Sequence, residues 1–181
     1  AQDIQKALTD LKPKMLIMNH ASNVGGNILP VEEISKSIQD FDTYFVIDTA
    51  QTAGTLDIDF IKLNLDALAF TGHKGLYGPQ GTGGVILGNR LAKELVPLIQ
   101  GGTGSRSDLM EQPGFLPDKF EAGTLNTPGI AGLTAGIDFV MEHKGRIYEH
   151  EMKLTKRFLE GLSNIHGIKV LGPRTIDKRV S

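Results

Sequence analysis

The sequence has no cysteine, no tryptophan and no long apolar run. Without cysteine the chain can form no disulfide framework, no thiolate metal site and no cysteine nucleophile. No segment approaches the roughly 18 consecutive apolar residues of a membrane-spanning helix. Residues 1–14 also lack the apolar core of a secretory signal peptide. We therefore expect a cytoplasmic protein with no membrane partner, and we predict no metal site.

The sequence also has no large excess of positive or negative charge. The 19 basic and 21 acidic residues leave a net charge of −2, which gives no electrostatic reason to expect a nucleic-acid partner. The apolar share of 40% and the charged share of 22% are usual for a soluble globular protein. A chain of 181 residues is long enough for one domain with a sizeable core.

Short apolar segments alternate with helical patterns in the first half of the chain. Four of these segments are predicted as strands, at residues 14–18, 44–47, 67–70 and 83–87. The first three are joined by long or helical connections, which favours a parallel sheet, whereas only a loop fits before the fourth, which is therefore expected to be antiparallel. The pattern predicts a three-layer α/β fold with a mainly parallel sheet and helices on both faces.

Helical periodicity flanks these strands and dominates the second half of the chain. Helices are predicted around Ile4 to Leu11, after Pro30, and over residues 90–98, 128–142 and 147–162. Residues 100–118 are expected to form a surface loop, and residues 168–171 a last short strand.

Polar residues cluster after the first three predicted strands. They are Asn19, His20, Ser22 and Asn23, then Asp48 and Gln51, then Thr71, His73 and Lys74. Ligands of open parallel sheets bind at the carboxyl ends of the strands, so these side chains are expected to share one crevice. Taken singly, Asp48 is also typical of a helix N-cap and Asn23 of a turn.

This set matches the chemistry that binds pyridoxal phosphate. Its aldehyde needs a lysine, its ring nitrogen an acidic partner, its phenolic oxygen amide donors and its phosphate hydroxyl and N–H groups. Lys74, Asp48, Gln51 and Asn23 can supply the first three of these needs, and Thr71 and His73 can contact the phosphate.

Four motifs resemble the cysteine desulfurase branch of the class V aminotransferases, which use pyridoxal phosphate. They are NHASNVGGNILPVEEI, VIDTAQTAG, FTGHKGLYGPQGTGGV and FEAGTLNTPGIAGL. The resemblance implies that Lys74 is the catalytic residue and forms a Schiff base with the cofactor. It implies that Asp48 pairs with the ring nitrogen, that Gln51 and Asn23 contact the cofactor, and that Thr71 and His73 contact the phosphate.

The resemblance also has implications for the rest of the chain. Gly101, Gly102 and Thr103 match a stretch that reaches the phosphate in the partner subunit's site, so a homodimer is expected. Arg106 and Ser107 either line that shared mouth or are solvated. A structural role is expected for His20, and mostly structural roles for Glu121, Thr124 and Asn126.

Members of this family are roughly twice as long, so residues 1–181 are expected to be part of the large, cofactor-binding domain. The first residues of the large domain and a C-terminal small domain are not in this sequence. The resemblance implies conversion of L-cysteine to L-alanine, with the sulfur passed as a persulfide to an acceptor protein. This chain alone is expected to bind pyridoxal phosphate weakly or not at all and to be inactive.

Three alternatives stay open at this stage. The first is another class V reaction, such as that of an aminotransferase, a selenocysteine lyase or a kynureninase-like enzyme. The second is a non-catalytic interaction module that retains the site residues. The third, a nucleotide-binding domain, is disfavoured because the sequence has neither G-x-x-x-x-G-K-[ST] nor G-x-G-x-x-G after a strand.

Overall fold

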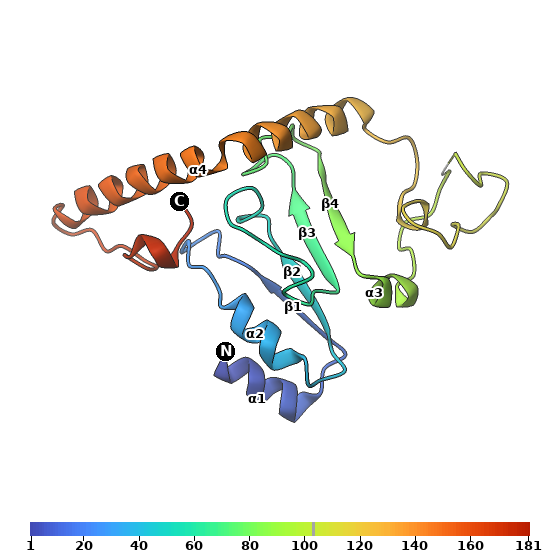
Figure 1. Ribbon diagram of the computed structural model, residues 1–181, viewed down its shortest axis with the longest axis horizontal. Coiled ribbons are helices and arrows are strands. Elements are labelled where there is room, and N and C mark those ends of the chain that lie inside the picture. The colour runs from blue at the N-terminus through green and yellow to red at the C-terminus, as the bar shows by residue number, and fades with distance from the viewer. Residues whose placement is uncertain (103) are drawn as a thin grey trace.

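The computed structural model describes residues 1–102 and 104–181, and a four-stranded sheet lies at its centre (Figure 1). The strands are β1 (Met15–Asn19), β2 (Tyr44–Asp48), β3 (Ala67–Thr71) and β4 (Gly83–Leu87). They lie in the order β1-β2-β3-β4, with β1, β2 and β3 parallel and β4 antiparallel to β3. The predicted mixed α/β sheet with an antiparallel last strand is therefore confirmed.

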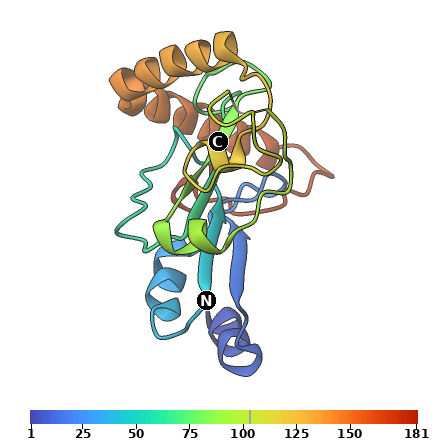
Figure 2. The same ribbon diagram turned by 90° about the vertical axis from the view of Figure 1, so that its right-hand side faces the viewer.

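The described residues also form four helices and two short 3-10 turns. They are α1 (Gln2–Leu11), α2 (Val31–Ile38), α3 (Asn89–Glu94) and α4 (Thr127–Ser163), with 3-10 turns η1 (Asp118–Phe120) and η2 (Ile176–Lys178). Lys12 ends α1 in the left-handed conformation, immediately before Pro13. Pro30 occupies the N-cap position, immediately before the first residue of α2. Seen from the side, α1 and α4 lie toward opposite ends of the strands (Figure 2).

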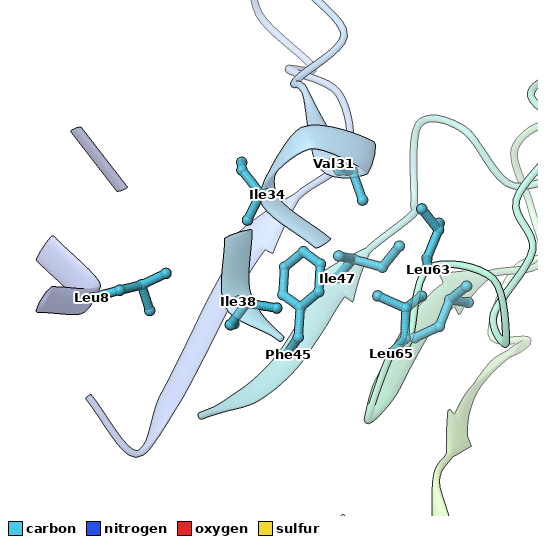
Figure 3. Packing of buried hydrophobic residues seen from close by; sticks show 9 residues of the cluster. Leu8, Val31, Ile34, Ile38, Phe45, Ile47, Leu63 and Leu65 are labelled. Carbon is cyan, nitrogen blue, oxygen red and sulfur yellow. The ribbon is translucent and has the colours of Figure 1, made fainter. Parts of the chain in front are cut away.

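The core lies on one face of the sheet. Phe45 and Ile47 of β2 are fully buried and meet side chains from α2, among them Ile34 (Figure 3). Leu8 of α1 is buried in the same cluster. Because neighbouring strands pair Leu68 with Ile47, β3 adds to the same face. The alternation of side chains thus gathers the apolar residues of three strands under two helices.

The opposite face of the sheet is more open than predicted. Ile17 of β1 and Val85 of β4 point to it, and 66% and 56% of their surfaces are exposed. The connection from β2 to β3 forms turns rather than a helix, and its Leu63 and Leu65 join the first core. In the part of the chain that the structure describes, α1, α2 and α4 therefore pack on the first face.

In the second half of the chain, the structure differs from three predictions. Residues 128–142 and 147–162 belong to one helix of 37 residues, α4, which continues through Gly145. The helix predicted over residues 90–98 ends at Glu94. Residues 168–171 form no strand, and instead Arg179 forms an isolated bridge with Asn27.

Residues 1–102 and 104–181 were searched for a membrane-spanning helix and for a metal-binding cluster. No helix among them is long and apolar enough to cross a membrane. They also contain no cluster of three or more acidic, histidine or cysteine side chains that could hold a metal ion.

Candidate functional site

The carboxyl ends of the three parallel strands meet at one edge of the sheet, and a cavity of about 240 Å³ opens there. It is lined by Asn19, Ala21, Asn23, Asp48, Ala50, Gln51 and Lys74. The structure therefore brings together four predicted site residues, Asn23, Asp48, Gln51 and Lys74. The loops after β1, β2 and β3 each contribute at least one of them.

Asp48 is the last residue of β2 and is paired in register with Asn19 of β1. Its Oδ1 accepts a hydrogen bond of 2.8 Å from the backbone N–H of Ala50, which fixes the carboxylate at the mouth of the next turn. Its Oδ2 has no hydrogen-bond partner within the described residues. A carboxylate oxygen thus remains available at the cavity.

Asn23 lies in a tight turn that follows β1. The Ser22 Oγ accepts hydrogen bonds from the backbone N–H groups of Val24 and Gly25, both at 3.2 Å. Gly26 closes the turn with φ 72°, a conformation that favours glycine. The end of the chain supports this turn, because the N–H of Val180 donates to the Gly26 carbonyl at 2.9 Å. Sequence patterns gave no signal for that last contact.

Lys74 lies in the loop that joins β3 to β4. The Gly78 N–H donates to the Gly72 carbonyl at 2.7 Å, which closes the loop around the lysine. The loop also passes against the turn after β2 at Gly54 and Gly75. A Cβ on Gly54 would lie 2.1 Å from the Gly75 carbonyl oxygen, so this approach requires glycine. The Lys74 amine forms no ion pair with a described residue.

Thr71 and His73 do not line the cavity. They bind each other instead, with 2.8 Å between the Thr71 Oγ1 and the His73 Nδ1. Both belong to the segment that leads from β3 to Lys74, and His73 is exposed. Their contact with a phosphate stays a prediction.

The other predicted residues lie elsewhere. Thr103 lies outside the described residues. Gly101 and Gly102 line a separate recess with Arg106 and Ser107, so they do not join the Lys74 cavity within this chain. Asn126 caps α4, because its Oδ1 accepts a hydrogen bond of 3.1 Å from the Gly129 N–H.

His20 is 2% exposed and faces away from solvent behind the cavity lining. Its Nδ1 lies 3.0 Å from the Oγ1 of Thr52, a residue that is fully buried. Burial lowers the pKa of the His20 imidazole below its ordinary value, and the charge of Glu32 opposes this shift. The structural role expected for His20 thus has a defined partner, Thr52, which sequence reasoning missed.

The chemical groups around the cavity are of the types that bind pyridoxal phosphate. They comprise one primary amine, one carboxylate with a free oxygen and three side-chain amides, of Asn19, Asn23 and Gln51. Asn19 is among the polar residues noted at the end of the first predicted strand, but no cofactor contact was predicted for it. Among the described residues, no hydroxyl side chain lines the cavity.

Comparison with known proteins identifies the class to which this fold and site belong. Residues 1–181 match the family described as aminotransferase class-V. The chain therefore belongs to this family.

Three relatives narrow the comparison. A probable cysteine desulfurase of Pyrococcus abyssi is 40% identical over 91% of this chain and 42% of its own length. The apo structure of a cysteine desulfurase from Thermococcus onnurineus NA1 matches with a TM-score of 0.83 at 36% identity, covering 98% of this chain and 45% of that chain. The structure described as SspA in complex with cysteine matches at 31% identity with a TM-score of 0.62, covering 76% of this chain and 35% of that chain. This chain thus spans less than half the length of these relatives.

Proposed function

We propose that residues 1–181 form the cofactor-binding part of a cysteine desulfurase-type enzyme that uses pyridoxal phosphate. The observation that carries the proposal is the single cavity that gathers Lys74, Asp48, Gln51 and Asn23 from three strand ends. Membership of the class V family and the desulfurase names of the relatives support it.

Each residue has a role that follows from its chemistry and place. The Lys74 amine binds the cofactor covalently, and when released it can hold and return a proton. Asp48 binds the ring nitrogen through its free Oδ2, while its Oδ1 stays tied to the Ala50 N–H. The amides of Gln51 and Asn23 donate to oxygen atoms of the cofactor. When bound, pyridoxal phosphate supplies an aldehyde and a ring that withdraws electrons from the reacting bond.

We propose L-cysteine as the substrate of the whole enzyme, with L-alanine as product and the sulfur passed to an acceptor protein. The related SspA was solved in complex with cysteine, which supports an amino acid of this kind. The chain has no cysteine to receive the sulfur. We propose that the sulfur-receiving group belongs to another part of the enzyme, and we expect residues 1–181 alone to be inactive.

We further propose that the enzyme is a homodimer in which Gly101, Gly102 and Thr103 serve the partner subunit's phosphate site. The support is that Gly101 and Gly102 line a recess apart from the Lys74 cavity of their own chain. Sedimentation velocity of the whole enzyme tests this proposal, and a monomer that retains activity contradicts it.

Lys74 gives the direct test of cofactor binding. The purified chain is mixed with pyridoxal phosphate, reduced with borohydride and digested for mass spectrometry. We expect the mass of the reduced cofactor on the peptide that contains Lys74, and its loss in Lys74→Ala. The exposed Lys93 of α3 provides the matched control, since Lys93→Ala removes a lysine far along the chain from the cavity. Equal labelling of Lys74 and Lys93 in the wild type contradicts the proposal.

A further inference from the structure

Three buried polar residues alternate with the residues that line the cavity. His20 stands between Asn19 and Ala21 in the sequence, Thr49 follows Asp48, and Thr52 follows Gln51. Their exposed fractions are 2% for His20 and 0% for both threonines. The segments that follow β1 and β2 thus direct some side chains to the cavity and the adjacent ones into the protein.

These three residues are connected to one another, and we call them the buried polar chain. The His20 Nδ1 lies 3.0 Å from the Thr52 Oγ1, which in turn lies 3.4 Å from the Thr49 carbonyl oxygen. The N–H and the hydroxyl of Thr49 both donate to the Ala69 carbonyl of β3 at 2.8 Å. The hydrogen bonds therefore run from the end of β1, past the end of β2, to β3.

Backbone contacts of His20 strengthen the same connection. Its N–H donates to the Asp48 carbonyl at 2.8 Å, and its carbonyl accepts from the Leu29 N–H at 2.9 Å. His20 consequently holds both ends of the turn that carries Asn23. Thr52 holds the turn that carries Gln51, since its N–H donates to the Thr49 carbonyl at 2.9 Å.

We infer that the buried polar chain positions the cavity residues, and that the hydroxyl of Thr52 is the link that sets the spacing of the two turns. This inference rests on the proposed function, because the spacing matters for a ligand that Asn23, Asp48 and Gln51 bind together. None of the three buried residues lines the cavity. They are positioning residues and not catalytic ones.

Thr52→Val tests this role, because valine keeps the shape of threonine and removes its hydroxyl. Thr43→Val is the matched control. The Thr43 side chain is also buried, with 4% exposed, and its hydroxyl donates to the Pro13 carbonyl at 2.7 Å. Thr43 lies just before β2, at the opposite end of that strand from the cavity. Thr52→Ser retains the hydroxyl and serves as the rescue variant.

The first readout needs no cofactor. Amide hydrogen exchange of residues 21–27 and 50–53 is measured in the full chain under native conditions. We expect Thr52→Val to raise the exchange rates in both turns by about fivefold, the factor for loss of one buried hydrogen bond. Thr43→Val should leave both turns unchanged, and Thr52→Ser should restore them. Unchanged exchange in Thr52→Val, or equal effects of the two valine variants, overturns the inference.

The second readout is the dissociation constant of pyridoxal phosphate, followed by absorbance. Thr52→Val should weaken binding by about fivefold, whereas Thr43→Val should bind as the wild type does. Equal binding by the two valine variants also overturns the inference. If the wild type gains no cofactor on Lys74, the proposed function fails, and the exchange of the two turns still decides the positioning role by itself.

Discussion

The imidazole of His20 has little contact with water and one hydroxyl partner, so its protonation is tied to the folded state. Burial lowers the pKa of His20 from its ordinary value of 6.5, and the negative charge of Glu32 only partly offsets this effect. Near pH 6 the unfolded chain therefore binds more protons at this residue than the folded chain does. This difference links the stability of the protein to pH.

The sign of the pH dependence follows from the lowered pKa. The contribution of neutral His20 to stability is fully present above pH 6.5 and decreases as the pH falls from 6.5 toward the folded-state pKa. The free energy of unfolding, measured with urea between about pH 5 and pH 8, should show this loss. That range spans the ordinary pKa of histidine. His20→Asn keeps a polar atom near the Nδ1 position and cannot titrate. We expect it to flatten the dependence, and an unchanged slope in this variant contradicts the assignment to His20.

The glycines of the site show how two loops can approach closely enough to share a cavity. The turn after β2 and the loop of Lys74 meet at Gly54, whose φ is 85°, and at Gly75. At Gly54 a side chain meets two obstacles, the positive φ and the nearby carbonyl of Gly75. Gly81 separates these effects, because its φ is 77° and an added Cβ there has nothing within 4 Å.

Gly54→Ala is therefore expected to destabilise the fold more than Gly81→Ala does. The positive φ alone costs about 1–2 kcal/mol, which is the effect we expect at Gly81. The steric conflict at Gly54 adds to this, giving a total of about 3 kcal/mol or more. Denaturant unfolding of the two variants measures the difference. Gly54→Ala should also reduce the yield of cofactor trapped on Lys74, because relief of the clash displaces the loop. Equal destabilisation by the two variants excludes a tight contact between the loops.

At the scale of elements, the sequence pattern predicts what depends on local periodicity. The strands around Phe45 and Leu68 alternate or run apolar. Of the polar residues at or after their ends, Asp48, Gln51 and Lys74 line the cavity, whereas Thr71 and His73 do not. Connections between distant residues lack such a signal. The Arg90 guanidinium donates to both carboxylate oxygens of the buried Asp66 at 2.9 and 2.8 Å, and no local pattern pairs these two residues.

The continuity of α4 shows a different limit of sequence reasoning. The apolar pattern is interrupted between Glu142 and Ile147, where Gly145 also disfavours helix, and this predicts two helices. The helix nevertheless continues through this interval: Gly145 and Arg146 are exposed, while the half-buried His143 packs edge-on against Phe139, one turn earlier. Lys144 in the same interval forms an ion pair with Asp57, a tertiary contact that the local apolar pattern does not indicate.

At the scale of the whole molecule, α4 is unevenly packed. Its first half contacts the Lys74 loop closely, since a Cβ on Gly136 would lie 2.5 Å from the Leu76 carbonyl oxygen. Leu133 and Val140 are also buried there, whereas the only buried residue of α4 after position 140 is Met152. Phe158 is 66% exposed near the C-terminal end of the helix, which extends away from the sheet (Figure 1).

This difference predicts that the two ends of α4 open with different free energies. An isolated helical segment of this length is marginal in water, and tertiary packing supplies most of the stability of helices in proteins. We therefore expect amides of residues 154–163 to exchange hydrogen by local opening, well before those of residues 130–140, which should open with the core. Substitutions give a second measure of the same difference. Phe158→Ala should change the unfolding free energy by less than about 1 kcal/mol.

The matched substitution in the core is Phe45→Ala, because Phe45 is fully buried between β2 and α2. It should cost about 3–5 kcal/mol through lost burial and the cavity left behind. A similar cost at Phe158, or uniform protection along α4, would mean that the C-terminal half of the helix belongs to the cooperative core. If instead the two halves differ as expected, the stable half of α4 is the one that supports the Lys74 loop.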